Sequence, residues 1–324
     1  MGEIYSAYRE CVETSGPEAL PLAVRLWERL DPTHWMLEWH LPTWLGAAFG
    51  LQPLVSSELV LSNVLGLASI RLQDDLADDE IDPADVQAAR ALSAALYDAA
   101  LGVYRHRFSS SSPLWRRLEK WMREWRSADA PLTPWDADAP DQRAMPAPAD
   151  LARRGAPLKI SAFAVCLLAG MSSRFEMVDA CLDHALAAMV MYDHVCDWQE
   201  DLAAGRWNAF VARYGAHPQR RVNASANRSS VFAEMMARRA VADQFALIQV
   251  ELGCAARSAT ELGSEPLKTY FVGLAVKLEG EANLLEQRYA ALGDAALALV
   301  FGTGQTPKEG ARTDGRQTVR PAHG

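Results

Sequence analysis

The amino-acid sequence predicts an all-α protein, and three observations support this. Apolar residues recur at helical spacing along most of the 324-residue chain, and no convincing series of strands interrupts them. Half of the residues are hydrophobic, which is enough for a large core. Two long apolar helical patterns each end in a cluster of aspartates.

The elements follow in order from this periodicity. The stretch from Ile160 to Met171 is the longest apolar run, and it is too short to span a bilayer, so it is expected to be a buried core helix. The expected helices cover about residues 17–30, 34–50, 54–80, 83–107, 113–127, 149–172, 175–204, 229–262 and 266–300.

The domain organisation follows from one long connection. Residues 127–148 are rich in Pro, Ala and Asp, which favours a surface connection between helices. One aspartate cluster lies on each side of it, so a site that joins them requires a single domain, expected at 1–301. The Gly-, Thr- and Arg-rich segment 302–324 is expected to be a disordered tail.

Composition excludes several classes of function. The net charge of −9 argues against a nucleic-acid surface. The five cysteines are scattered without a CxxC spacing, as in a cytosolic protein with reduced thiols, and the polar start has no signal-peptide pattern. Hydrolase, kinase and dehydrogenase motifs are not evident in the sequence. A cytoplasmic protein without a stable membrane anchor is expected.

The first aspartate cluster follows the apolar pattern that runs from residue 59 to residue 72. On a helix, Asp74, Asp75 and Asp78 share an arc of about 100°. Arg71 lies on the same stripe and can pair with Asp74 or Asp75. Taken alone, this segment is equally well explained as an exposed acidic helix end.

The second cluster has a stricter spacing. Asp193, Asp197 and Asp201 stand at i, i+4 and i+8 after the apolar pattern of residues 180–192. This spacing places them on one helix face over a rise of roughly 12 Å. Three carboxylates on one face repel each other unless a cation holds them.

Both clusters are predicted at helix carboxyl ends, where the helix itself carries partial negative charge. Six aspartates at two such ends indicate a missing positive charge. Hard divalent cations, most often Mg²⁺, take carboxylate and phosphate oxygens together. Gly205 is expected to end the second helix, and Arg206 then stands where it can meet a phosphate. The residues themselves therefore favour diphosphate chemistry in a helical protein.

These motifs resemble those of the class I isoprenoid synthase superfamily. DDLAD at 74–78 is similar to its DDxxD motif. DHVCDWQED at 193–201 has the spacing of the terpene synthase N-D-x-x-S-x-x-x-E triad, with Asp in all three ligand places. EQRY at 286–289 resembles the Arg-Tyr pair that follows this triad in microbial terpene synthases. The resemblance covers most of residues 54–290 and implies a single-domain helical bundle around a deep apolar cavity.

Two other branches of the superfamily share features with the chain. RLQDDLADDE at 71–80 and DWQEDLAAGR at 197–206 resemble squalene and phytoene synthase motifs. Pro157-Leu158-Lys159 and the apolar helix after it are similar to the lysine-containing helix of trans-prenyltransferases. The basic motifs that bind isopentenyl diphosphate in chain-elongating enzymes are not evident, and neither is the tyrosine-containing middle motif of the squalene branch. The likeness is therefore greatest to a bacterial class I terpene synthase.

The resemblance also implies roles for individual residues. It implies three Mg²⁺ ions bound by Asp74, Asp75, Asp78, Asp193, Asp197 and Asp201. It implies diphosphate binding by Arg153, Arg154, Lys159, Arg206 and Arg288, with one of the two adjacent arginines acting as the diphosphate sensor. It implies catalytic roles for Asp74, Asp75, Arg288 and Tyr289.

The expected function is that of a lyase acting on a carbon–oxygen bond. Mg²⁺ and the cationic side chains would drive ionisation of farnesyl or geranylgeranyl diphosphate, followed by cyclisation to a terpene. One alternative is a two-substrate prenyltransferase, either chain-elongating or head-to-head. The other is a non-catalytic helical protein whose acidic residues are merely solvated. The expected partner is the prenyl diphosphate, with no nucleic acid and with a homodimer left open.

Overall fold

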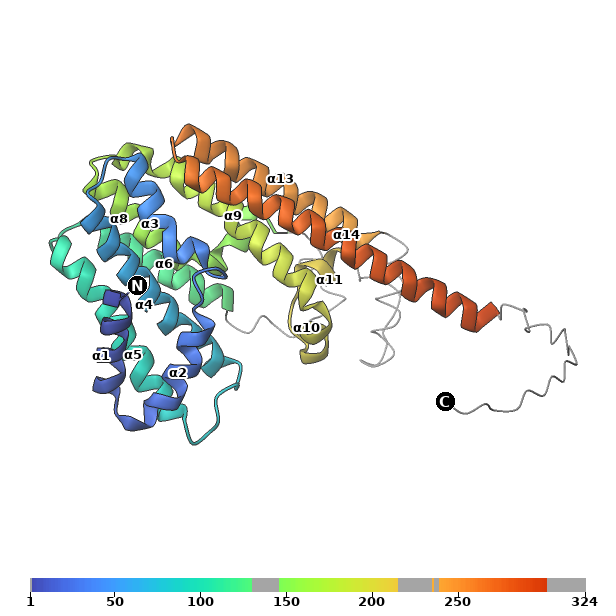
Figure 1. The fold of residues 1–324 in the computed structure, drawn as a ribbon, viewed down its shortest axis with the longest axis horizontal. Coiled ribbons are helices and arrows are strands. Elements are labelled where there is room, and N and C mark those ends of the chain that lie inside the picture. The colour runs from blue at the N-terminus through green and yellow to red at the C-terminus, as the bar shows by residue number, and fades with distance from the viewer. Residues whose placement is uncertain (1, 130–145, 215–234, 236–238, 302–324) are drawn as a thin grey trace, which may run out of the picture. The chain divides into compact units, whose positions relative to one another are not determined.

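The prediction of an all-α protein is confirmed. The structure is a computed structural model that describes residues 2–129, 146–214, 235 and 239–301, and the described residues form helices and no strand. Two compact units divide the chain, residues 1–282 and residues 283–324. Figure 1 shows the order of the helices. The expected tail at 302–324 and most of the connection at 127–148 lie outside the described residues.

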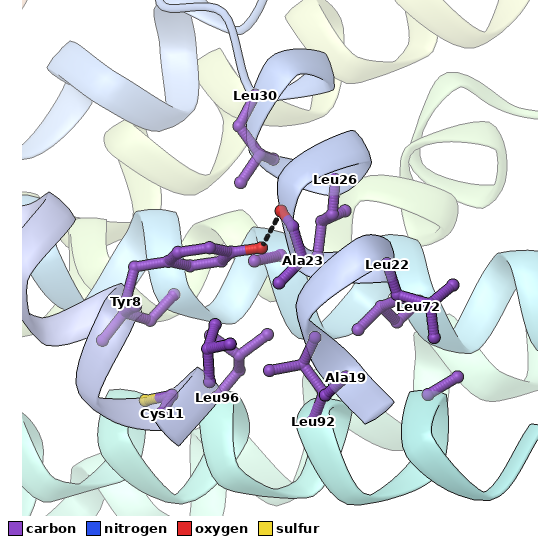
Figure 2. Packing of buried hydrophobic residues seen from close by; sticks show 14 of the residues in the cluster. Tyr8, Cys11, Ala19, Leu22, Ala23, Leu26, Leu30, Leu72, Leu92 and Leu96 are labelled. Atoms are coloured by element: carbon purple, nitrogen blue, oxygen red, sulfur yellow. Dashed lines mark hydrogen bonds between the residues drawn. The ribbon is translucent and has the colours of Figure 1, made fainter. Parts of the chain in front are cut away.

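The N-terminal part of the first unit packs four helices around one apolar cluster. They are α1 (Gly2–Ser15), α2 (Leu20–Arg29), α4 (Pro53–Ala77) and α5 (Val86–Arg107). Leucines of α2, α4 and α5 fill the cluster, and Figure 2 shows the buried Tyr8 hydroxyl donating to the Ala23 carbonyl at 2.7 Å. Sequence periodicity did not predict α1, because its charged residues dilute the apolar face.

The remaining helices up to α8 belong to the same unit. They are α3 (Met36–Ala48), α6 (Pro113–Asp129), α7 (Pro148–Leu151), the 3₁₀ segment η3 (Ala152–Leu158) and α8 (Lys159–Leu168). The single helix expected at 149–172 is therefore wrong in its first half. Pro157 lies inside η3, and proline lacks the N–H that a regular α-helix needs there.

The chain then continues through α9 (Phe175–Cys196), α10 (Trp198–Ala204) and α11 (Ala209–Tyr214). The helix α13 (Ala240–Glu261) packs against α9, and α14 (Glu265–Phe301) follows. Gln249 of α13 donates to the Ala275 carbonyl of α14 at 2.7 Å. The boundary between the two compact units falls within α14.

The helix expected at 175–204 is interrupted at Asp197. This residue has φ −101° and ψ 5°, and it separates α9 from α10. The amide of Asp197 still donates to Asp193, and that of Asp201 donates to Asp197, each at 2.9 Å. The interruption is thus a local bend that leaves Trp198 buried directly after it.

Among the described helices, α4 is long and apolar enough to cross a membrane by length and composition. Half of its apolar stretch is buried inside the protein, which is the behaviour of a core helix.

Candidate acidic site at two helix ends

The first aspartate cluster lies at the carboxyl end of α4. Asp75 is buried, Asp74 is partly buried and Asp78 is exposed. Asp79 then takes a left-handed conformation with φ 57°, and the Glu80 amide donates back to the Asp75 carbonyl at 2.9 Å. This closing hydrogen bond is typical of helix ends and fixes the backbone that carries the cluster.

Two arginines contact the first two aspartates of this cluster. Arg29, the last residue of α2, donates to both carboxylate oxygens of Asp75, at 2.7 and 3.1 Å. Arg71 lies 3.5 Å from Asp74, which confirms the expected pairing on the α4 stripe. Sequence reasoning missed Arg29, because no local pattern indicates which of the distant arginines reaches Asp75.

The second cluster lies along the bend between α9 and α10. Asp193 is exposed, Asp197 is partly buried, and the Asp201 side chain is 14% exposed. Gly205 ends α10 with φ 68°, as expected for a helix terminator, and the Arg206 amide donates to the Asp201 carbonyl at 2.8 Å. The ends of α4 and α10 thus close with the same kind of backbone hydrogen bond.

Asn208 holds the Asp201 side chain in place. Its amide nitrogen donates to Asp201 at 2.7 Å and to the His194 carbonyl at 3.0 Å. Its oxygen accepts from the Phe210 and Val211 amides, which makes it the cap of α11. Sequence reasoning missed this residue, although an asparagine directly before an apolar run is a recognisable capping signal.

Arg206 joins the two clusters. Its Nε lies 3.0 Å from the Asp201 carboxylate, and its Nη1 lies 3.8 Å from the Asp78 carboxylate. Burial raises the pKa of Asp193, and the positive charge of Arg71 opposes part of that rise, so a cation of the first cluster acts on the second. The two helix ends, over a hundred residues apart in sequence, therefore converge within the first compact unit.

The protein environment disfavours the charged forms of two aspartates in the second cluster. Burial raises the pKa of Asp197 to about 6, and the charges of Asp193, Asp201 and Glu200 add to the effect. Asp193 keeps an open face to solvent, yet the surrounding protein also raises its pKa. The two carboxyl groups share a hydrogen bond. Burial and the neighbouring carboxylates thus favour the neutral form of Asp197 more than water would.

This pair gives the metal-free protein a pH-dependent stability. Because the folded pKa of Asp197 is about 6 and its ordinary value is 3.8, the folded state binds a proton more tightly than the unfolded state. The contribution of Asp197 to the free energy of unfolding is therefore fully present below about pH 4, and it is lost as the pH rises from about 4 through 6. Relative to wild type, Asp197→Asn should gain about 1–2 kcal/mol between pH 4 and pH 7, after discounting for solvent screening. Urea unfolding in the presence of a chelator measures this gain, and a pH-independent difference would contradict the raised pKa of Asp197.

The structure distinguishes the two adjacent arginines of η3. Arg153 points to Asp150, with 2.7 Å between them, and half of its side chain is exposed. Arg154 lies 3.4 Å from the His194 imidazole, and its charge opposes the rise that burial causes in the pKa of Asp193. Burial, with a smaller contribution from Arg154, lowers the pKa of His194 to about 3, so this imidazole is neutral at pH 7. Arg154 therefore faces the second cluster and Arg153 does not.

The backbone of η3 approaches α9 closely beside these arginines. A Cβ atom at Gly155 would lie 2.4 Å from Leu186 Cδ2. This distance is shorter than any ordinary contact, so glycine lets η3 pack directly onto α9.

Lys159 is not brought together with the aspartate clusters. It is buried at the start of α8, and its ammonium lies 2.8 Å from Asp179 and 2.5 Å from Asp183. Asp183 precedes Asp193 on α9 by ten residues, a rise of about 15 Å. This lysine thus pairs with two carboxylates that belong to neither cluster, and it lies away from the place where the two helix ends converge.

Arg288 and Tyr289 belong to the second compact unit, on the later part of α14. Arg288 is exposed there. The side chain of Tyr289 lies outside the described residues. Their predicted roles stay predictions that rest on the motif alone.

The residues fit a hard cation by chemistry more than by arrangement. Every candidate ligand is a carboxylate, which suits Mg²⁺. Among the residues that the structure describes, no three His, Cys, Asp or Glu side chains are gathered closely enough to hold a metal ion. Arginines occupy Asp75 and Asp201. A metal ion that binds these two carboxylates has to replace the arginines already paired with them.

Comparison with known proteins does not name a family. No protein-family model matches the chain. A search of curated proteins also finds no match. The motifs at 74–78, 193–201 and 286–289 are therefore the basis of the likeness to class I isoprenoid synthases.

Proposed function

We propose that this protein is a Mg²⁺-dependent class I terpene synthase that ionises a linear prenyl diphosphate, farnesyl or geranylgeranyl, and cyclises the resulting cation. The observation that carries the proposal is the convergence of two aspartate-bearing helix ends, joined by Arg206. An acidic surface that was merely solvated would not need one arginine to pair with aspartates from two distant helix ends.

The proposed chemistry assigns distinct work to the side chains. Asp74, Asp193 and Asp197 would hold the metal ions, which neutralise the diphosphate and stabilise its charge as it departs. Arg154 has a neutral imidazole as its hydrogen-bonding neighbour, so its charge is available to a phosphate oxygen. Arg206 would exchange its carboxylate partners for the diphosphate. Motif likeness adds Arg288 as a further phosphate ligand.

The two-substrate alternative makes a different demand on the protein. A prenyltransferase needs a second basic pocket for isopentenyl diphosphate, or a second allylic site for head-to-head condensation. The acidic residues that follow Asp78 offer no such pocket in the sequence. The cyclase therefore remains the first choice within the superfamily.

One set of incubations tests the proposal. Geranyl, farnesyl and geranylgeranyl diphosphates are each supplied with Mg²⁺, with and without isopentenyl diphosphate, and both released diphosphate and hydrocarbon products are measured. Release from one prenyl diphosphate alone, with a cyclic product, is the expected result. Product that forms only with isopentenyl diphosphate would indicate chain elongation. If none of the three substrates releases diphosphate, with or without a chelator, the result would favour the alternative of a non-catalytic helical protein.

A further inference from the structure

The arginines that pair with the first aspartate cluster contact residues at the connection between α2 and α3. Arg29 is the last residue of α2, and Trp35 stands directly before α3. The Trp35 indole nitrogen donates to the Arg29 carbonyl at 2.8 Å. The Arg71 guanidinium lies over the Trp35 ring, 5.7 Å from its centroid. The two arginines that contact Asp74 and Asp75 thus both contact Trp35, Arg29 through its backbone carbonyl and Arg71 through its guanidinium.

The connection itself is well fixed. The Asp31 carbonyl accepts from the amides of His34 and Trp35, each at 3.0 Å. The carbonyl of the buried Leu30 accepts from the Trp39 indole at 2.9 Å. A connection that is bonded at both ends can hold a side chain in one place, whereas an open loop would not.

The two neighbouring aspartates differ in what they can bind. The Asp75 side chain is 6% exposed, and both of its oxygens accept from Arg29. The Asp74 side chain is 26% exposed, and the Arg71 guanidinium lies 3.5 Å from it. Mg²⁺ sheds its waters reluctantly and needs solvent room around its ligands. Asp74 offers that room and Asp75 does not.

We infer that Arg29 and Trp35 are positioning residues of the site, with Asp75 as the anchor that ties α4 to them and Asp74 as the metal ligand that this anchor orients. The inference rests on the proposed function, since it assigns roles within the same metal–diphosphate site. Trp35 restrains Arg71 beside Asp74, and the Arg29–Asp75 pair restrains the last turn of α4. The cluster is then preorganised before a metal ion arrives.

The test measures binding of Mn²⁺ together with inorganic diphosphate, by electron paramagnetic resonance and calorimetry. Asp74→Asn should lower the number of Mn²⁺ ions bound per protein. Asp75→Asn, Arg29→Gln and Trp35→Phe should keep that number and weaken binding about tenfold. Arg29→Lys should recover part of the loss. Arg25→Gln is the matched control, because Arg25 lies one turn earlier on α2 and contacts Asp85, directly before α5, and not the first aspartate cluster.

A double variant keeps the test valid if Arg29→Gln destabilises the fold. Arg29→Gln leaves a buried carboxylate unpaired, whereas Arg29→Gln/Asp75→Asn is neutral at that site. The double variant should fold and bind no more weakly than either single variant, because the pair acts as one unit. A lower ion count in Asp75→Asn would make Asp75 a ligand and overturn the inference, as would unchanged binding in both Arg29→Gln and Trp35→Phe.

A second measurement separates this inference from the proposed function. If the wild-type protein binds no Mn²⁺ with diphosphate, the proposed function fails. Amide exchange then decides the anchoring by itself. The Asp78 and Glu80 amides, bonded to the Asp74 and Asp75 carbonyls, should exchange at least tenfold faster in Arg29→Gln than in Arg25→Gln. Equal exchange in the two variants would overturn the anchoring role.

Discussion

Asp74→Asn should lower turnover of the prenyl diphosphate by about a thousandfold or more while leaving the protein folded. A metal ligand contributes several kcal/mol of charge stabilisation at the departing diphosphate, and each 1.4 kcal/mol is about a factor of ten in rate. The side chain keeps its size and remains partly exposed, so little packing is lost. Removing one carboxylate from the acidic end of α4 also relieves repulsion.

Steady-state kinetics at saturating Mg²⁺ measures this loss, with thermal unfolding to confirm the fold. Asp98→Asn is the control, because Asp98 lies on α5, is mostly exposed and pairs with Arg105. Asp197→Asn should behave like Asp74→Asn, since it removes a candidate ligand from the opposite helix end. Ordinary turnover in both variants would show that neither carboxylate holds a metal ion.

Arg154→Gln should lower kcat by about a hundredfold to a thousandfold, the usual cost of removing one preorganised donor from a developing negative charge. Arg153→Gln should stay within a few-fold of wild type. The two residues are adjacent in sequence and equal in charge, yet only Arg154 is oriented toward the second cluster.

Comparing these two variants removes any general effect of lost positive charge in an acidic protein. The pH dependence of kcat adds a second readout, because loss of Arg154 should raise the pKa of Asp193 further. Equal losses in the two variants would assign the effect to charge alone, and equal retention would remove η3 from the site.

Sequence patterns predicted the fold class and the two acidic helix ends for a definite reason. Helical periodicity and the i, i+4 spacing of aspartates are local properties, so residues 54–77 and 175–196 could be assigned without knowledge of their neighbours. Arg71 was also predictable, because its partner Asp74 lies one turn away on the same helix.

The partners contributed by other helices were not predictable. Arg29 is 46 residues from Asp75, and the pairing depends on how α2 packs against α4. Lys159 matched a phosphate-binding motif, yet it pairs with Asp179 and Asp183, which no sequence motif singled out. The bend at Asp197 was missed as well, since the hydrogen-bonding pattern on either side is nearly helical.

The contact between Gly155 and Leu186 has a consequence for how sequences related to this one can diverge. An alanine at 155 would force the buried Leu186 side chain to move, because the added Cβ would lie 2.4 Å from its Cδ2. A shorter residue at 186 would make room for that methyl group. Divergence at these two positions should therefore be correlated, with loss of the glycine more frequent in chains that carry valine or alanine in place of the leucine.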